Sequence, residues 1–291
     1  MRLIHLTDPH LSSLADTHLA GLRGKQWLGY QSWWRRRRHV HQRTRLDQVT
    51  NAVLALQPDR LCITGDLVHI GLETEHQQAR EWLEQLGDPA RISLSPGNHD
   101  LYTARAWSSA RRLWSPWLPA CAPTADSRDA FPHCANCAGV AIVTAHSSPP
   151  VPWYSAQGEL GRAQRERLHG LARSLSHGPR ILLIHHPVVP PAAYGQLPAR
   201  KALRDAGKAA DTFAAYDVIL HGHIHHNHTY GLGASRVFCT ASASAPDASF
   251  RVFDFAHDPA SGHWQACMTL HTLRGNAFEA TTQTTWTITR D

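Results

Sequence analysis

The ten residues RISLSPGNHD, 91–100, contain the pattern that decides the fold. Their first half, Arg91 to Ser95, is a short apolar run of the kind that forms a buried strand in a layered α/β sheet. Their second half, Gly97 to Asp100, places amide, imidazole and carboxylate groups directly after that strand. Because ligands of open α/β sheets bind beyond the carboxyl ends of the strands, this stretch predicts a functional loop at a strand end.

Short apolar runs that end in polar residues recur at 2–7, 60–64, 140–145, 180–184 and 217–220. Stretches with helical spacing lie between some of them, from Leu46 to Leu56, from Trp82 to Leu86 before Gly87, and from Arg162 to Ser176. The alternation of strand, loop and helix predicts an α/β fold with its sites on the loops.

The pattern changes after residue 235, where residues 236–241, 250–255 and 264–273 alternate like antiparallel strands joined by turns. The Thr-rich end, 281–289, fits either one more edge strand or a frayed tail. No internal repeat or long linker interrupts the chain, so we expect one domain over residues 1–291.

The composition excludes several classes of protein. The chain has 291 residues, 42% of them hydrophobic and 18% charged, with 10 Trp, which argues against disorder. No run of 18 apolar residues predicts a membrane-spanning helix, and the amino terminus lacks the apolar core of a secretory signal. Six scattered Cys do not suggest a disulfide-stapled fold. We therefore expect a cytoplasmic protein that begins at Met1.

Five motifs at strand ends carry the residue types that bind divalent transition metals. They are Asp8-Pro9-His10, Gly65-Asp66, Gly97-Asn98-His99-Asp100, His185, and His221-Gly222-His223-Ile224-His225. Residues two apart on an extended segment point the same way. Asp8 and His10 can therefore face the same site, and so can His223 and His225. The glycines 65, 97 and 222 permit tight turns. Each short motif alone is weak evidence, whereas all five in this order are strong evidence.

This set of motifs resembles that of the calcineurin-like metallophosphoesterase superfamily, D-x-H, G-D, G-N-H-D/E, H and G-H-x-H, across residues 8–225. The resemblance implies a four-layer α/β/β/α sandwich with mixed sheets and a two-metal phosphoester hydrolase. One metal ion would be held by Asp8, His10, Asp66 and His225, and the other by Asp66, Asn98, His185 and His223. Asp66 would bridge the two ions, of which Mn is the first expectation and Fe, Zn or Mg the alternatives.

The mechanism that this resemblance implies is attack of an activated water on phosphorus, in line with the leaving oxygen. His99 follows the candidate ligand Asn98, and we expect it to donate a proton to the leaving oxygen. Asp100 is expected to orient the His99 ring.

A basic, aromatic insert at about 19–45 separates the first two motifs. No acidic residue lies between Asp16 and Asp47, whereas eight basic residues do, and the rest of the chain is close to neutral. If the segment is helical, the aromatic residues 27, 30 and 34 share one face. The residues with which the insert would meet an anion are Trp27, Trp34, Arg35, Arg36, Arg37 and Arg38.

Four interpretations of this insert stay open. Residues 22–45 suit an anionic membrane surface, in the manner of a helix that lies in the interface. They also suit a lid whose Arg side chains grip a second phosphate. A solvated basic face that has no partner is an equally strong alternative. Nucleic acid is the least favoured partner.

The substrate hypotheses follow from the insert and from His99. The insert, with the sequence that follows Gly97, resembles the membrane-associated branch that cleaves UDP-2,3-diacylglucosamine in lipid A synthesis. That branch carries Arg where this chain has His99, whereas cyclic-nucleotide phosphodiesterases carry His and are the alternative. A non-catalytic metal- or lipid-binding protein on the same fold is the alternative of another class.

Smaller signals complete the sequence-based predictions. Cys134 and Cys137, with His133 beside them and Cys121 upstream, fit a small zinc site or a disulfide. His186, His226 and His228 neighbour candidate ligands, and we expect them to lie outside the metal coordination. Tyr102 either packs or contacts substrate.

Overall fold

The computed structural model describes residues 1–11, 13–120, 127–175, 178–189 and 198–289. One six-stranded sheet has the order β12-β11-β10-β1-β2-β3. Its strands are β1 (Arg2–Leu6), β2 (Arg60–Ile63), β3 (Ile92–Leu94), β10 (Ser249–His257), β11 (Trp264–Arg274) and β12 (Ala277–Ile288). β1, β2 and β3 are parallel, whereas β10 to β12 are antiparallel. The sheet is therefore mixed.

The second sheet has the order β4-β5-β6-β7-β9-β8 and is mixed as well. Its strands are β4 (His133–Cys137), β5 (Val140–Thr144), β6 (Arg180–Leu183), β7 (Val218–His221), β8 (His228–Leu232) and β9 (Ser235–Cys239). β5, β6, β7 and β9 run parallel, and the two edge strands are antiparallel to their neighbours.

The two sheets pack face to face, because alternate strand residues from both meet in one core. Leu3 and Phe253 of the first sheet share this core with Ile142, Leu183 and Phe238 of the second. Burying apolar strand faces against each other removes them from water and stabilises the sandwich.

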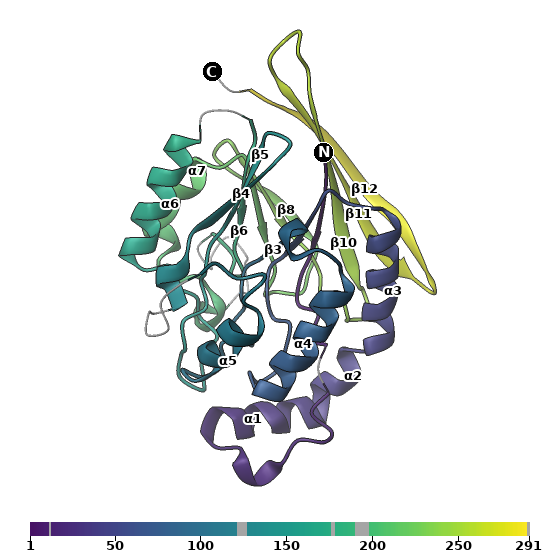
Figure 1. The fold of residues 1–291 in the computed structure, drawn as a ribbon, viewed down its shortest axis with the longest axis vertical. Coiled ribbons are helices and arrows are strands. Elements are labelled where there is room, and N and C mark those ends of the chain that lie inside the picture. The colour runs from purple at the N-terminus through teal and green to yellow at the C-terminus, as the bar shows by residue number, and fades with distance from the viewer. Residues whose placement is uncertain (12, 121–126, 176–177, 190–197, 290–291) are drawn as a thin grey trace.

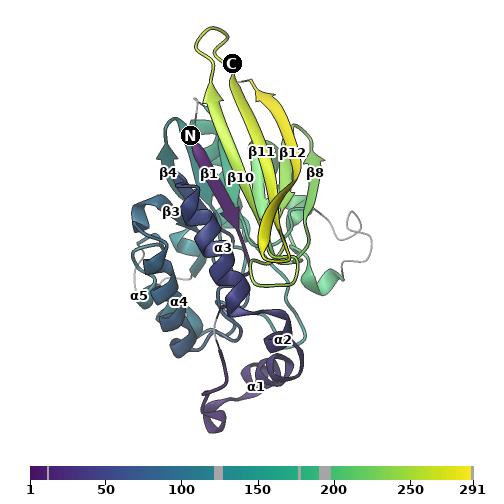
Figure 2. The same ribbon diagram turned by 90° about the vertical axis from the view of Figure 1, so that its right-hand side faces the viewer.

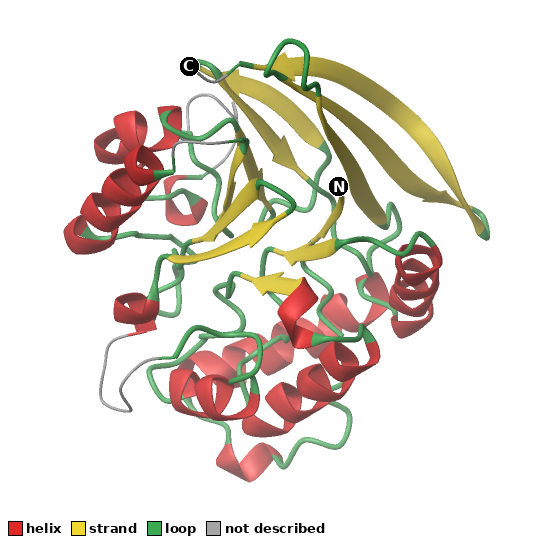
Figure 3. Ribbon diagram, turned by 45° about the horizontal axis from the view of Figure 1, so that its top comes forward, coloured by secondary structure: helices red, strands yellow, loops and turns green. Residues whose placement is uncertain are grey.

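Helices cover the two outer faces. α3 (Arg43–Ala55), α4 (Glu73–Gln85) and α5 (Ala106–Leu113) pack on the first sheet, and α6 (Arg162–Ser174) and α7 (Ala210–Ala214) on the second. Figure 1 shows α6 and α7 on one side of the strands and α3 on the other, and Figure 3 shows helices and strands in separate layers. The predicted four-layer α/β/β/α sandwich is confirmed.

The strand predictions are confirmed in place, with some corrections of pairing. The sequence of residues 281–289 allows either an edge strand or a frayed tail. In the structure β12 pairs with β11 along its length and forms the edge of the sheet. The segment at 236–241 becomes β9, which pairs with β8 in the expected antiparallel sense but with β7 in parallel. Edge strands β4 and β8 were not predicted, because their sequences are short and polar.

Within the residues that it describes, the structure contains neither a zinc site nor a disulfide at Cys134 and Cys137, the two options that the sequence left open. Both thiols are free and lie on β4. Residues three apart on a strand point to opposite faces of the sheet, so the two sulfurs cannot converge on one zinc ion or on each other. Cys121 lies outside the described residues.

The insert forms η1 (Leu19–Gly21), α1 (Gly24–Ser32), the π-helical turn η2 (Trp33–Arg37) and α2 (Arg38–Val40). Figure 2 shows β1 running toward the end of the molecule where α1 and α2 lie. None of the helices formed by the described residues has the length and apolar character needed to cross a bilayer.

The aromatic face of the insert differs by one residue from the expectation. The ring contacts run from Trp27 to Tyr30 and on to Trp33, with centroids 6.1 and 5.9 Å apart. Trp33 is buried, whereas Trp34 is exposed. The wide turn η2 begins at Trp33, which shifts the helical spacing at this point.

Candidate metal centre

Seven candidate ligands follow the carboxyl ends of five parallel strands. Asp8 and His10 come after β1, Asp66 after β2, Asn98 after β3, His185 after β6, and His223 and His225 after β7. The parallel strands of each sheet end at one edge, and contacts between their loops join the two edges. The structure therefore brings all seven predicted side chains together.

The first group of candidate ligands consists of Asp8, His10, Asp66 and His225. Oδ1 of Asp8 lies 3.1 Å from Nε2 of His225, and Oδ2 of Asp66 lies 3.9 Å from Nε2 of His10. Asp8, His10 and Asp66 offer ligand atoms within 4.8 Å of one another and can hold a metal ion. All three of these side chains are buried.

The second group consists of Asp66, Asn98, His185 and His223, and it centres on Nε2 of His185. This atom lies 3.3 Å from Oδ2 of Asp66, 3.2 Å from Oδ1 of Asn98 and 3.2 Å from Nδ1 of His223. Oδ2 of Asp66 is thus close to a histidine of each group. A single carboxylate oxygen between two sets of ligands is the arrangement expected for a bridging residue.

Hydrogen bonds behind the rings fix their orientation. Nδ1 of His10 donates to the carbonyl of Val68 at 2.8 Å, and Nδ1 of His185 donates to the carbonyl of Thr64 at 2.6 Å. Both rings therefore present Nε2 to the centre, which is the orientation that metal-binding histidines require. Nε2 of His223 is buried without a hydrogen-bond partner among the described residues. These donors fit a pair of divalent cations.

The electrostatic field of the centre favours positive charge. Burial lowers the pKa of His185, but the carboxylates of Asp66 and Asp8 outweigh it and raise that pKa to about 9. Burial raises the pKa of Asp8, yet His225 and His185 bring it well below its usual value. His185 would lose its proton on holding a divalent cation here, because ligand histidines bind metal in the neutral form.

Strained backbone positions gather at the centre. Asp8, His10, Asp66, His223 and His225 all have positive φ, between 39° and 70°. This left-handed region is unfavourable for residues other than glycine, and such strain persists only where the surrounding structure enforces it. The fold therefore holds five of the seven candidate ligands in a conformation that their own sequence disfavours.

Two motif glycines are required for space as well as for turns. A Cβ on Gly97 would overlap the carboxylate of Asp66, and a Cβ on Gly222 would overlap Oγ1 of Thr7 and the carboxylate of Asp8. Neither glycine has positive φ, whereas Gly65 does, at 84°. The tight-turn role predicted for all three is thus a close-approach role at 97 and 222.

The orienting role predicted for Asp100 is wrong. Its carboxylate, which is fully buried, accepts backbone amides within 3.2 Å from Gly97, Asp66, Leu67 and Val68. Burial and the nearby charge of Asp66 raise the pKa of Asp100 to about 7. Asp100 therefore holds the loops after β2 and β3 together rather than orienting the ring of His99.

The ring of His99 has other neighbours. Its Nδ1 lies 2.5 Å from the carbonyl of His69 and 3.1 Å from a guanidinium nitrogen of Arg37, and it stacks on Tyr102. Burial and the charge of Arg37 hold the pKa of His99 well below its usual value. Its backbone amide donates to Oδ1 of Asp66, so the residue is anchored at the centre.

The four consecutive arginines of the insert point in different directions. Arg37 reaches His99, as described above, while the guanidinium of Arg38 lies 3.7 Å above the ring of Trp34. Arg35 and Arg36 are exposed. Trp27 and Trp34 are exposed by 39% and 48%, so they lie on the outer surface of the insert.

Sequence reasoning missed His41, at the end of the insert. Its ring lies 4.4 Å from that of His10 and 5.4 Å from that of His225, and these three histidines form a further group that can hold a metal ion. His41 stands in no motif, and the only available signal was its place after a basic aromatic run. The insert thus supplies the centre with a side chain.

His186 is buried with His185 and His223, and these three histidines also form a group that can hold a metal ion, which differs from the expectation that His186 lies outside the coordination. Nδ1 of His186 contacts Oγ of Ser147, and its Nε2 donates to the carbonyl of Ala156, so both nitrogens are occupied. His226 and His228 are exposed. Tyr102 packs in a small cluster with Trp33 and Ile70 while also facing the centre through His99.

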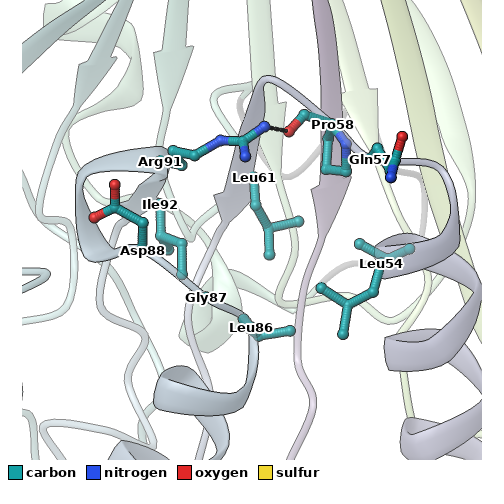
Figure 4. A pocket seen from close by; sticks show the side chains of 10 residues that line it. Leu54, Gln57, Pro58, Leu61, Leu86, Gly87, Asp88, Arg91 and Ile92 are labelled. Atoms are coloured by element: carbon teal, nitrogen blue, oxygen red, sulfur yellow. Dashed lines mark hydrogen bonds between the residues drawn. The ribbon is translucent and has the colours of Figure 1, made fainter.

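A separate cavity of about 450 Å³ lies at the amino ends of β2 and β3, away from the centre. Figure 4 shows its lining, in which Arg91 donates to the carbonyl of Pro58. Leu54, Leu61 and Leu86 supply apolar walls. It contains none of the candidate ligands.

The chain belongs to the calcineurin-like phosphoesterase family, whose model (Metallophos) matches residues 1–227. No curated protein is similar enough in sequence to count as a match.

Of three similar solved structures, the first two described below share the fold. The purple acid phosphatase PPD1 from yellow lupin (Lupinus luteus) seeds is 14% identical, with a TM-score of 0.57 and coverage of 100% of this chain and 54% of that one. A candidate 5'-nucleotidase from Staphylococcus aureus is 11% identical, with a TM-score of 0.52 and coverage of 89% and 51%. Vacuolar protein sorting 29 from Cryptosporidium parvum is 10% identical, with a TM-score of 0.42 and coverage of 99% and 98%. The chain spans about half the length of the first two, and at these identities their likeness supports the fold alone.

Proposed function

We propose that this protein is a phosphohydrolase that uses two divalent metal ions to cleave a phosphodiester or a pyrophosphate. The observation that carries the proposal is the place of Oδ2 of Asp66, 3.9 Å from Nε2 of His10 and 3.3 Å from Nε2 of His185. Family membership supports a phosphoesterase, and the buried donors support the pair of cations.

In this proposal Asp8, His10, Asp66 and His225 hold one ion, and Asp66, Asn98, His185 and His223 hold the other. Such ions, with Mn as our first choice, lower the pKa of water and neutralise the charge that develops on a phosphate. The chain itself keeps the rings of His10 and His185 fixed through Val68 and Thr64, so the donors need no reorganisation on binding.

His99 is our candidate for the residue that assists the leaving oxygen. It follows Asn98, and its amide is fixed to Asp66, which places its ring at the side of the centre that faces Arg37. Because the pKa of His99 lies well below its usual value, the ring is neutral near pH 7 and would assist the leaving oxygen as a hydrogen-bond donor.

Hydrolysis of bis(p-nitrophenyl) phosphate in the presence of Mn²⁺ tests the proposal. We expect turnover in the wild type and its loss in Asp66→Ala, while the exposed Asp211→Ala variant serves as the control. The alternative of another class, a non-catalytic metal- or lipid-binding protein, predicts no hydrolysis with Mn²⁺, Fe²⁺, Zn²⁺ or Mg²⁺. That result would overturn the enzymatic assignment.

UDP-2,3-diacylglucosamine and cyclic nucleotides are the two substrate hypotheses. UDP-2,3-diacylglucosamine contains two linked phosphates and two acyl chains. A cyclic nucleotide contains one phosphate and no acyl chain. A cavity of about 600 Å³ opens beside His10 and His41, and Leu11, Ala15 and Trp33 supply part of its wall. This partly apolar wall at the centre favours the lipid-like hypothesis. Comparing the kcat/KM of the two compounds on the same Mn²⁺-loaded preparation separates them.

We also propose that residues 1–291 form one domain whose insert, at about 19–45, contacts an anionic membrane surface. Pairing of β1 with β10 joins the two ends of the chain in one sheet, which supports a single domain. Exposed Trp27, Leu28 and Trp34 lie on the insert together with exposed Arg35 and Arg36. Tryptophan rings beside arginine side chains suit the headgroup region of an anionic lipid surface.

Vesicle co-sedimentation tests the membrane proposal. Vesicles of phosphatidylcholine with phosphatidylglycerol should bind the wild type more than vesicles of phosphatidylcholine alone. Binding should fall in the double variant Arg35→Gln, Arg36→Gln. The control double variant Arg173→Gln, Lys208→Gln has the same net charge but changes exposed residues elsewhere. Equal loss in both variants, or in neither, would contradict the proposal.

A further inference from the structure

A cationic pocket of about 140 Å³ opens next to His99. Two of its basic side chains come from the insert, Lys25 and Arg37, and two come from η6 (Ala199–Lys201), Arg200 and Lys201. The insert and η6 are far apart in sequence, so the fold itself gathers these four cations around one hollow.

The carboxylates that act on these cations lie outside the pocket: Asp66 acts on Lys25 and Arg37. In the described part of the chain, no ion pair joins any of them to a carboxylate, and the residues that line the pocket include no Asp or Glu. Burial and the charges of Arg200, Arg36 and Arg37 lower the pKa of Lys201. Like charges held close together repel one another, and an anion in the pocket would offset that repulsion.

The pocket adjoins the metal centre through shared residues. Asn98 and His99 line it, and a guanidinium nitrogen of Arg37 lies 3.1 Å from Nδ1 of His99. Asn98 in turn lies 3.2 Å from His185 in the centre. An anion held by Arg37 would therefore lie next to a phosphate held at the centre. The two anionic groups could then be adjacent phosphates of one substrate.

The insert positions its two cations firmly. Nζ of Lys25 donates to the carbonyl of Val151 at 3.1 Å and lies 4.4 Å above the ring of Tyr102. Arg37 is half-buried beside the same ring. Preorganised cations lose little freedom when an anion binds, which strengthens recognition.

We propose that this pocket is a subsite for a second phosphate, and that the substrate is a compound in which two phosphates are neighbours. This inference rests on the proposed function, because it places the cleaved phosphate at the metal centre. The exposed rings of Trp153 and Tyr154 line the outer rim and would contact the organic part beyond the second phosphate. A cyclic nucleotide, which has one phosphate, would leave the four cations unmatched.

Calorimetric binding of ADP and AMP tests the subsite, since these probes differ by one phosphate. The measurement uses the Mn²⁺-loaded full chain with the same free Mn²⁺ in cell and syringe. We expect ADP to bind at least tenfold more tightly than AMP, the effect of one charge-assisted contact. Arg37→Gln should remove this preference, and Lys201→Gln, which is exposed, should reduce it by about threefold.

Arg35→Gln is the matched control, because Arg35 lies in the same cluster but outside the pocket. Equal affinity for ADP and AMP in the wild type would overturn the subsite, as would an equal loss in Arg35→Gln and Arg37→Gln. If the ADP preference is present and depends on Arg37, but bis(p-nitrophenyl) phosphate is not hydrolysed, the proposed function fails and the subsite stands. If bis(p-nitrophenyl) phosphate is hydrolysed but ADP is not preferred, the subsite fails and the proposed function stands.

Discussion

The carboxylate of Asp100 accepts a hydrogen bond from the backbone amide of Asp66 at 2.9 Å. The same carboxylate accepts three further amides, so one side chain fixes both the loop that carries Asp66 and the loop that carries Asn98. The spacing of the candidate ligands therefore depends on a fully buried residue that belongs to neither group of candidate ligands.

Replacing Asp100 with Ala should destabilise the protein strongly. The change leaves buried amides without an acceptor, and each such amide costs about 1–3 kcal/mol. We expect the free energy of unfolding in urea to fall by about 4 kcal/mol, with water recovering part of the loss. Asp100→Asn keeps one acceptor oxygen and should lose less. A change below about 1 kcal/mol in Asp100→Ala would show that the four hydrogen bonds are not important for stability.

Replacing His99 with Ala should lower turnover far more than metal content. Its ring lies beside the centre but belongs to neither group of candidate ligands, so metal binding should persist. Loss of a group that assists the leaving oxygen lowers kcat by about 10²–10⁴-fold. Steady-state kinetics and elemental analysis of one preparation measure both quantities, with exposed His226→Ala as the control. Wild-type turnover in His99→Ala would refute the role.

Replacing His41 with Ala should weaken metal binding on the Asp8 side of the centre. Nδ1 of His41 contacts Oγ of Ser244 at 2.9 Å, which leaves Nε2 for the group that contains His10 and His225. Loss of a ligand or of a neighbour that orients one lowers metal affinity by about 10–100-fold. Titration with a competing chelator measures it. His39→Ala, an exposed residue two positions earlier, should have no effect.

The pH dependence of the reaction should report Lys25. Burial lowers the pKa of this amine from 10.5 to about 8, so it carries its charge below that pH and loses it above. The kcat/KM for a two-phosphate substrate should therefore fall as the pH rises through about 8. Lys25→Arg keeps its charge at higher pH and should remove this fall. The same fall in Lys25→Arg would assign it to another group.

The sequence predicts those strands and helices whose apolar residues recur at regular spacing. It also predicts the candidate ligands, because each of them stands in a short motif. The short strand before Asp8, the helix from Arg162 and the seven candidate ligands could be located because each depends on local pattern. Asp100 shows the limit of this reasoning. Its place beside His99 in the sequence suggested a contact, whereas the turn after β3 directs its carboxylate to the backbone of the neighbouring loop.

The contributions of the insert could not be predicted for a different reason. Its helical phase depends on the π-helical turn at Trp33, which no residue in the stretch signals. That phase decides which of four identical arginines reaches His99 and which remain in solvent. His41 meets His10 only because the chain returns to the sandwich at α3, a relationship between segments that local pattern does not contain.

The positive φ angles of five candidate ligands have a consequence for protein engineering. Glycine adopts this conformation without strain, and Nε2 of His223 has no hydrogen-bond partner among the described residues, so His223→Gly should make the metal-free chain more heat-stable while removing a candidate ligand. Directed evolution for thermal resistance alone would then enrich glycine at this position. A screen that aims at a robust catalyst must score bound metal at every round, because the most stable variants would be the empty ones.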